Sequence, residues 1–287
     1  MTVTSRRFSP SVDRLRNVLT QLIIYVILIS GALWALFPFA WMVLSSLKGY
    51  AEAAAAEAFF PTRWLFTNYI QAWNQVEYFP RYFANTIFIA TATVLGVLIT
   101  STLAAYAFAR MEFPGRETLF MILLATMMIP FEVTLVPNFL IVRMLQWVDH
   151  YEAMIIPWAA SALSIFLLRQ FFRSIPAELY DAALIDGCTH LRFLTTIVLP
   201  LSRPALITSA LFTFLGSWNS LMWPILVTNR PEMRPIQVGM MSFIGDAGTQ
   251  IQLLLAAVTI SVIPVILVYL FLQRWFIEGI ATVGIRG

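Results

Sequence analysis

Apolar stretches without any charge recur along the chain and are longer than soluble proteins usually contain. No Asp, Glu, Lys or Arg occurs at residues 17–47, 82–109 or 247–273. A helix needs about 20 apolar residues to cross a bilayer, so each stretch is long enough. Shorter apolar stretches lie between them. The pattern predicts six membrane-spanning helices, at residues 20–44, 83–109, 115–134, 151–171, 205–227 and 252–273.

The composition indicates that lipid surrounds most of the chain. Hydrophobic residues make up 60% and charged residues 11% of the 287 residues, against about 25% charged residues in a typical soluble domain. The net charge of +3 is small, so it gives no reason to expect nucleic acid as a partner. The single cysteine, Cys188, excludes an internal disulfide. We expect an all-α integral membrane protein with six spans.

Basic residues set the expected orientation, because cytoplasmic loops carry an excess of Lys and Arg. With the N-terminus inside, cytoplasmic segments hold twelve of these residues and outer segments six. Both termini are then cytoplasmic, and the domains are a segment 1–16, a six-span region 17–273 and a tail 274–287. The first apolar stretch exceeds the 7–15 residues of a cleavable signal, so we interpret it as a retained anchor rather than a cleaved leader.

The cytoplasmic segment 172–204 carries the signals of a short helix. Pro176 suits a first helical turn, and Glu178 complements the positive end of the helix dipole. Gly187 suits the C′ position that ends a helix. The segment therefore predicts a helix of about ten residues.

One face of this helix is expected to carry Leu179, Ala182 and Ala183, by their i, i+3, i+4 spacing. Two of the three are alanines, whose small side chains let another backbone approach closely. Capped helices also occur in the internal loops of other multi-span proteins. Local physics therefore leaves two interpretations, a docking helix and an ordinary loop.

The wider spacing is more specific. An acidic-Ala-Ala triplet begins at Asp181, three residues separate it from Gly187, and nine more residues separate Gly187 from Ile-x-Leu-Pro, which begins at Ile197. This resembles the EAA signature of permease subunits of ATP-binding-cassette (ABC) importers, with Asp in place of the usual Glu. The resemblance implies a coupling helix that sits in a cleft of the ATPase subunit. The implied coupling residues are Asp181, Ala182, Ala183, Gly187, Ile197, Leu199 and Pro200.

Other segments are similar to the smaller permease of maltose-type carbohydrate importers, among them Ser217-Trp-Asn219 with Trp223-Pro224 and the final stretch 274–287. The resemblance implies the type I importer permease fold in the bacterial cytoplasmic (inner) membrane. It also implies three partners: a second, different permease, a dimer of ATPase subunits and an extracytoplasmic solute-binding protein. In that subfamily the C-terminal tail reaches between the ATPase subunits. The glycines that would permit close passage there are Gly279, Gly284 and Gly287.

The chain has no energy source of its own. A Walker-type phosphate loop needs Gly-x4-Gly-Lys, and no such loop precedes the single lysine, Lys48. We therefore expect ATP and Mg²⁺ on the partner ATPase subunits, and no cofactor, metal site or catalytic residue in this chain. The alternative is a stand-alone carrier or channel for a small polar solute. Carriers often have related halves, which this sequence lacks.

Four residues are candidates for contact with the solute, expected to be a sugar or sugar-like compound. Trp218, Asn219 and Trp223 combine aromatic faces with a polar group, as sugar sites do. Polar groups within spans also join helices, so both roles stay open. Glu132 lies between prolines, either at the outer rim or in a cavity lining. The sequence does not decide between a sugar and a glycerol phosphate ester.

The outer loop 228–251 is expected to face the solute-binding protein. It carries Arg230 and Arg234 near its start. These two residues would either dock on an acidic rim of that protein or be solvated.

Overall fold

The structure is a computed structural model that describes residues 10–245 and 248–284, and it is almost entirely helical. The exception is a pair of two-residue strands, β1 (Ile244–Gly245) and β2 (Gly248–Thr249), which pair antiparallel. The expected all-α fold therefore holds apart from this short hairpin.

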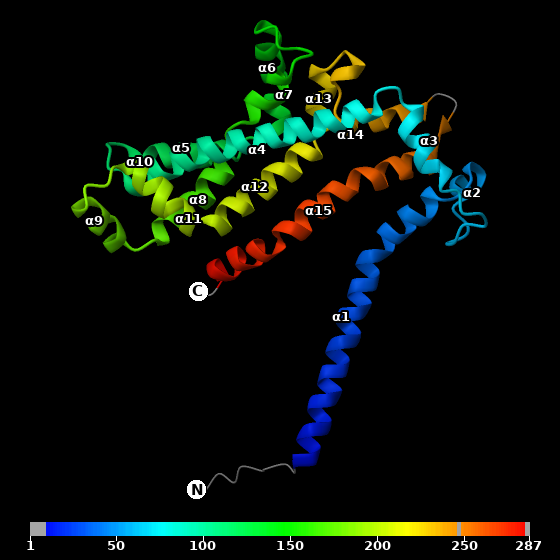
Figure 1. Ribbon diagram of the computed structural model, residues 1–287, viewed down its shortest axis with the longest axis horizontal. Helices are drawn as coiled ribbons and strands as arrows, with labels where there is room; N and C mark the ends of the chain where they lie inside the picture. Colours follow the sequence, from blue (N-terminus) through cyan, green and yellow to red (C-terminus); the bar gives the residue numbers. More distant parts are fainter. Residues whose placement is uncertain (1–9, 246–247, 285–287) are drawn as a thin grey trace.

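Three of the six predicted spans are unbroken helices. The predicted spans 20–44, 83–109 and 252–273 lie within helices that are long and apolar enough to cross a membrane. Figure 1 shows two of them along the long axis of the bundle, while the N-terminal one runs away from it. The three helices are α1 (Pro10–Ser46), α4 (Phe79–Arg110) and α15 (Ile251–Gly284).

The third and fourth predicted spans are bent helix pairs, so the count reaches six only if each bent pair is one span. The bend within the third is 97° and that within the fourth 41°. A single helix at 115–134 is therefore wrong: it ends at Thr126 and restarts after Pro130. Proline lacks an N–H and keeps the residue before it out of the helical conformation. The helices are α5 (Arg116–Thr126), α6 (Phe131–Met144), α7 (Tyr151–Ile155) with the 3₁₀ turn η1 (Ile156–Trp158), and α8 (Ala162–Ser174).

The fifth predicted span is also interrupted. Helix α12 (Arg203–Trp218) ends well before residue 227, and α13 (Met222–Val227) follows after three non-helical residues. A bend of 81° separates α12 from the helical stretch His190–Leu201 before it. The prediction of one helix over 205–227 is therefore wrong.

At the helix break near Pro157, a side chain of the neighbouring helix α4 donates a hydrogen bond to a backbone carbonyl that the break leaves free. After the 3₁₀ turn at 156–158, the Thr100 hydroxyl on α4 donates to the Ala159 carbonyl oxygen at 2.7 Å. Non-helical backbone at membrane depth is tolerated when neighbours supply such bonds. A Cβ on Gly96 would lie 2.9 Å from Ala159 Cβ and 3.3 Å from its Cα. Glycine therefore permits the close approach of α4 to this break.

Gly96→Leu is expected to separate α4 from the break before α8 and to reduce the yield of folded protein. The obstacle is Ala159, including its backbone Cα, and overpacking of this kind costs about 1–3 kcal/mol or more. The check is the thermal midpoint of the purified protein in detergent. Gly31→Leu is the matched control, because an added Cβ there meets nothing within 4 Å. Equal midpoints for the two variants would contradict the packing argument.

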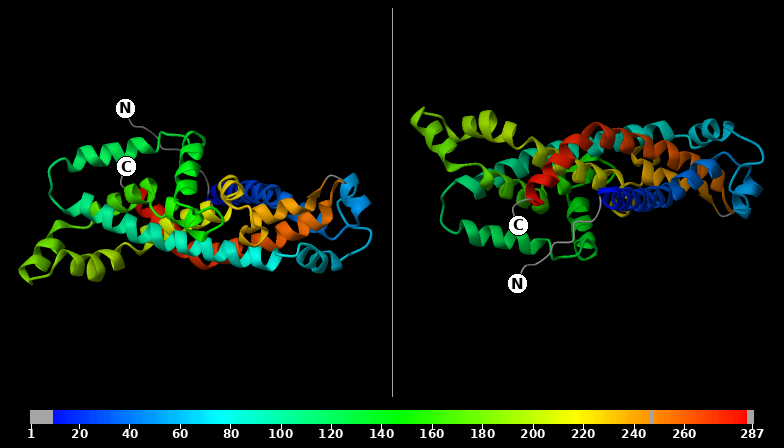
Figure 2. Two further views of the ribbon diagram at one scale, coloured as in Figure 1. Left: turned by 90° about the horizontal axis from the view of Figure 1, so that it is seen from above. Right: turned by 90° about the horizontal axis from the view of Figure 1, so that it is seen from below.

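The remaining elements lie mostly at the two ends of the bundle. Figure 2 shows α9–α11 at one end of the long axis and α2–α3 at the other. The short elements are α2 (Tyr50–Ala55), α3 (Thr67–Gln75), α9 (Ala177–Ile185), α10 (His190–Phe193), the π turn η2 (Leu194–Val198), α11 (Leu199–Leu201), η3 (Pro231–Met233), α14 (Ile236–Gly239) and η4 (Met240–Phe243).

The helices at both ends of the chain extend into the segments predicted to be cytoplasmic. Helix α1 begins at Pro10, within the segment 1–16. Helix α15 continues through Gly279 to Gly284, so those glycines lie in a helix rather than in an extended tail. An isolated glycine destabilises a helix by only about 1 kcal/mol relative to alanine. This cost is too small to terminate the apolar helix α15. Gly287 lies outside the described residues.

The largest cluster of buried side chains lies at the α9 end. It joins residues of α4, α5, α8, α9 and α10, so the short helices there are packed on the spans rather than hanging free. By contrast, the apolar side chains along α1 are exposed in the single chain, as suits lipid or another membrane chain. The buried members of the cluster are Ala105, Tyr106, Phe120, Ile165, Leu168, Phe172, Ile175, Ala183, Phe193, Leu194 and Val198.

Candidate functional site

The predicted short helix is present as α9. It spans nine residues, Ala177–Ile185, against about ten expected. Pro176 precedes it at the N-cap position, one place before the expected first turn. Glu178 lies in the first turn, where a negative charge complements the helix dipole.

Gly187 ends α9 in the conformation that the sequence predicts. Its φ of +70° is in the left-handed region, which glycine enters without the steric cost that other residues carry. Its N–H donates to the Leu184 carbonyl at 3.0 Å, and the Cys188 N–H donates to the Ala183 carbonyl at 2.9 Å. These two bonds form a Schellman motif, with Gly187 at C′. The turn directs the chain back toward the bundle.

The face predicted for Leu179, Ala182 and Ala183 is divided. Ala183 is buried in the cluster at the α9 end, whereas Leu179 and Ala182 are exposed. Residues 182 and 183 are separated by about 100° around the helix. Ala183 therefore packs into the cluster while Ala182 does not. Among the large apolar side chains of α9, Ile185 is the most exposed, at 87%. The open side of α9 is therefore apolar in part, which suits contact with another protein.

The second half of the signature packs against the first. Ile197 and Leu199 are partly buried and contact the same cluster that contains Ala183. Ile197 lies in the π turn η2, Leu199 begins α11, and Pro200 is exposed next to it. The two halves, distant in sequence, are therefore brought together around one core.

Arg110 connects the end of α4 to the segment just before α9. It lies in the last turn of α4, and its Nη2 donates to the Phe172 carbonyl at 2.8 Å and also to the Ile175 carbonyl. Both carbonyls belong to the stretch where α8 ends and the chain enters α9. Cations are favourable at such helix ends. A displacement of α9 is thereby linked to α4.

His190 makes a second link, after α9. Its Nδ1 lies 3.0 Å from the Tyr106 hydroxyl of α4 and 3.3 Å from the Tyr180 hydroxyl of α9. The Tyr106 ring is buried, and Tyr180 is partly buried. Helix α4 is therefore attached on both sides of α9, by Arg110 before it and by His190 after it.

Under the importer function that the resemblance implies, Tyr106→Phe is expected to reduce transport about fivefold while the partner subunits continue to hydrolyse ATP. It removes one hydrogen bond, typically about 1 kcal/mol, and keeps the buried ring. The measurement compares transport with ATPase rate in the reconstituted complex. Tyr180→Phe is the matched control and should have a smaller effect, because its hydroxyl is farther from His190. A parallel loss of transport and ATPase activity in Tyr106→Phe would indicate a folding defect instead.

A cavity of about 390 Å³ lies between α4, the α7–α8 break and α12–α13. Of the four residues proposed for solute contact, Trp223 lines it. The indole Nε1 of Trp223 donates to the Ala153 carbonyl of α7 at 2.8 Å, which fixes the ring. The lining residues are Thr86, Ile89, Thr93, Val97, Phe131, Met154, Trp158, Ala160, Ser161, Thr213, Gly216, Ser217, Ser220, Trp223, Pro224 and Pro235.

The other three candidates lie outside this lining. Trp218 is buried and packs on the rings of Phe83 and Phe214, with centroids 5.9 and 5.3 Å away. Asn219 is exposed, and its Nδ2 donates to the Leu215 carbonyl of its own helix at 3.0 Å. Glu132 is exposed in the first turn of α6, next to the lining residue Phe131. Trp218 therefore packs inside the bundle, while solute contact by Asn219 and Glu132 stays a prediction.

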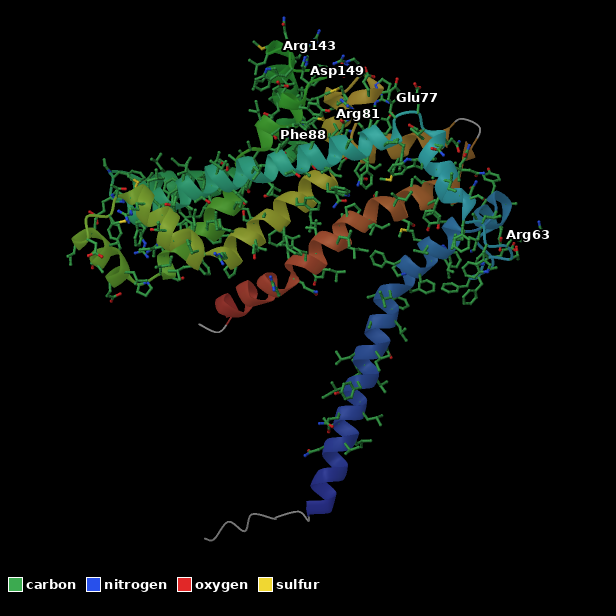
Figure 3. The ribbon with its side chains drawn as sticks, viewed as in Figure 1. Arg63, Glu77, Arg81, Phe88, Arg143 and Asp149 are labelled. Atoms are coloured by element: carbon green, nitrogen blue, oxygen red, sulfur yellow. The ribbon has the colours of Figure 1, made fainter. Side chains whose placement is uncertain are left out.

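The two arginines of the outer loop make internal contacts. The Arg230 guanidinium donates to the Asp149 carbonyl at 3.1 Å, and the Asp149 carboxylate accepts the N–H groups of Asn229 and Arg230. Arg234 donates to the Asn229 carbonyl at 3.4 Å. Figure 3 labels Asp149 in the part that projects from the side of the bundle above α4, where Figure 1 places α6 and α13. The two arginines therefore stabilise the conformation of the loop. The sequence analysis considered only docking or solvation for them.

Together, the interrupted apolar helices, the half-open cavity between them and the short packed helix at one end are the features of a membrane transport subunit. The chain belongs to the family described as binding-protein-dependent transport system inner membrane component, whose model matches residues 96–282. It is a multi-pass inner membrane permease of an ABC transporter, and ATP is hydrolysed on a separate subunit. The predicted class is confirmed, and the alternative of a stand-alone carrier is set aside.

Similar proteins cover nearly the whole chain. The arabinooligosaccharides transport system permease protein AraQ of Halalkalibacterium halodurans is 32% identical over 88% of this chain and 92% of its own length. The sn-glycerol-3-phosphate transport system permease protein UgpE of Yersinia pestis is 35% identical over 89% and 94%. A crystal structure of a bacterial ABC transporter involved in alginate import is 28% identical, with a TM-score of 0.78 over 95% of this chain and 100% of that chain.

Proposed function

We propose that this chain is the permease through which a sugar or sugar-like solute enters a bacterial cell. The cargo class is supported by relatives named for arabinooligosaccharides and for alginate, although another is named for glycerol-3-phosphate. In this proposal both termini are cytoplasmic, as the excess of basic residues in the predicted inner segments favours. The end of the bundle with α9 is then the cytoplasmic end.

The attachment of α4 on both sides of α9, by Arg110 and by His190, is the observation that supports the mechanism. ATP binding closes the ATPase dimer, the cleft that holds α9 moves, and α9 transmits the movement through Arg110 and His190 to α4. Helix α4 also lines the cavity with four side chains, so it connects the coupling segment to the interior. In this proposal the coupling residues are Asp181, Ala182, Ala183, Gly187, Ile197, Leu199 and Pro200.

The other partners follow from the same assembly. A second, different permease completes the transmembrane pathway, and a solute-binding protein delivers cargo at the end of the bundle opposite α9. Two ATPase subunits carry ATP and Mg²⁺, and the C-terminal stretch containing Gly279, Gly284 and Gly287 reaches toward them. This chain supplies no catalytic group and no metal site of its own in this proposal.

The docking of α9 is tested by cross-linking. Ile185→Cys in a Cys188→Ser background places one thiol at the most exposed of the large apolar side chains of α9. In the purified complex it should cross-link to the ATPase subunit, with a yield that changes when ATP is added. Leu22→Cys on the exposed side of α1 is the control and should give no ATPase adduct. Cross-links from Leu22 and none from Ile185 would contradict the proposal.

A further inference from the structure

We propose that Asn85 is a positioning residue that attaches the outer segment, residues 228–236, to α4, so that this segment and the coupling helix α9 move together. The inference rests on the proposed function, because it takes α9 to dock on the ATPase subunit and the outer loop to face the binding protein. It adds a named residue and a direction of signalling. A binding protein that docks outside acts on the ATPase subunits through α4.

Helix α4 is the part of the molecule best suited to carry movement from end to end. Among the described residues it is the only long unbroken span without a proline beyond its first turn. Helix α1 contains Pro38 and α15 contains Pro264, and the other candidate spans are bent helix pairs. Sharp kinks in helices arise mostly at prolines and at interruptions of the hydrogen-bond ladder. Figure 1 shows α4 along the length of the bundle, so a displacement at one end is delivered at the other.

The Asn85 amide attaches the outer end of α4 to two other segments. Its Nδ2 donates to the carbonyls of Glu232 at 2.9 Å and of Arg234 at 3.0 Å, both in the outer segment. Its Oδ1 accepts from the Tyr151 hydroxyl of α7 at 2.7 Å. Both donors and one acceptor of the amide are therefore used. The side chain is 1% exposed, so water is kept away from these bonds.

The neighbouring residues of α4 hold the same segment in place. The Thr86 hydroxyl oxygen accepts from the Ile236 N–H at 2.8 Å. A Cβ on Gly239 would lie 2.1 Å from the Tyr82 ring, so α14 rests directly against α4. Residues 82, 85 and 86 share one helix face by their i, i+3, i+4 spacing. The outer segment is therefore fixed in register against one turn of α4.

The two ends of α4 make the same kind of attachment. Asn85 donates to two backbone carbonyls outside, and Arg110 donates to the carbonyls of Phe172 and Ile175 before α9. Asn85 and Arg110 are about 38 Å apart along the axis, given a rise of about 1.5 Å per residue. Coupling between two binding sites is reciprocal. A movement of α9 that shifts the outer segment implies that docking on the outer segment shifts α9.

Asn85→Asp tests this attachment. The carboxylate keeps an acceptor for Tyr151 but replaces the Nδ2 donor by an oxygen, so both carbonyls of the outer segment lose their bonds. The ATPase rate of the reconstituted complex is measured with and without its binding protein, which is supplied in turn with an arabinooligosaccharide, maltose and sn-glycerol-3-phosphate. The variant should lower the stimulation by the binding protein about fivefold or more. The basal rate without binding protein should stay unchanged.

Asn68→Asp is the matched control. Asn68 is also buried, at 4% exposed, and its Nδ2 also donates to two backbone carbonyls, those of Ser46 and Lys48, both at 2.8 Å. These bonds join α3 to the end of α1 instead of joining the outer segment to α4. The same substitution therefore breaks the same kind of bond, and the stimulation should stay at the wild-type value. A merely structural role of Asn85 would give the two variants the same stimulation.

Tyr151→Phe is a milder variant for the case that Asn85→Asp does not assemble. It removes the bond to Asn85 Oδ1 and keeps the ring, which packs on Phe88 with centroids 4.9 Å apart. The stimulation should fall by a smaller factor, because the bonds to the outer segment remain. Tyr69→Phe is its control, since the Tyr69 hydroxyl lies 2.7 Å from Ser46 Oγ, and should leave the stimulation unchanged.

The outcomes separate this inference from the proposed function. Equal stimulation in Asn85→Asp and Asn68→Asp, or wild-type stimulation in Tyr151→Phe, would overturn the positioning role while ATP-driven uptake by the wild type leaves the importer function intact. A wild-type ATPase rate that the binding protein does not change would also overturn it. A complete wild-type complex that shows no ATP-driven uptake of any of the three solutes would overturn the proposed function itself.

Discussion

Replacing Gly187 by valine is expected to abolish uptake while leaving insertion in the membrane intact. The φ of +70° at this residue is left-handed, a region that costs other residues roughly 1–2 kcal/mol, and β-branched residues are true outliers there. An added Cβ would meet no atom within 4 Å, so the cost is backbone strain alone. The Schellman turn would rearrange, and α9 would lose its position.

Gly187→Asn is the control for this prediction, because asparagine is the residue that best tolerates the left-handed region after glycine. Uptake by the asparagine variant should stay within about threefold of the wild type, since its short polar side chain can hydrogen-bond locally in this conformation. The measurement is solute uptake by the reconstituted complex at equal protein level. Full uptake by Gly187→Val would show that the turn has no part in coupling.

Arg169→Met is expected to destabilise the α9 end of the bundle. The Arg169 side chain is 3% exposed, and its Nη2 bonds both carboxylate oxygens of Glu117 at 2.6 and 2.7 Å. Its Nε donates to the Phe108 carbonyl at 3.1 Å, and the guanidinium stacks 3.9 Å from the Phe120 ring centroid. One side chain on α8 therefore holds the end of α4 and the start of α5. Methionine keeps the length and loses every polar contact.

The expected fall in the thermal midpoint of the purified permease is roughly 5 °C or more. Glu117→Gln is the comparison variant: it keeps an acceptor for Arg169 but removes the charge. Because the Glu117 side chain is 58% exposed, water can replace part of its contribution and the fall should be smaller. Equal midpoints for Arg169→Met and wild type would contradict this role.

The coupling helix could be predicted from the sequence because its signals are local. Pro176, Glu178 and Gly187 are cap residues whose meaning depends only on their neighbours in the chain. Which side of the helix is buried depends on packing with distant segments. The sequence therefore predicted the helix and its end, whereas the burial of Ala183 beside the exposed Ala182 comes from packing that the spacing does not encode.

The broken spans and the cavity depend on contacts between elements. Hydropathy identifies apolar stretches, but it does not reveal that Pro130 begins a helix at 97° to the one before it. The cavity is assembled from several elements, so the sequence identified Trp223 and missed the other lining residues. Arg110 and Arg169 were counted only for orientation.

ATP-driven uptake in proteoliposomes tests the central claim most directly. This chain is reconstituted with its co-purifying permease, ATPase subunits and binding protein, and a labelled neutral sugar is added outside with ATP inside. The account predicts uptake that requires both ATP and the binding protein and that disappears in Gly187→Val. Uptake by this chain alone, without ATP or partners, would contradict the account and indicate a carrier or channel.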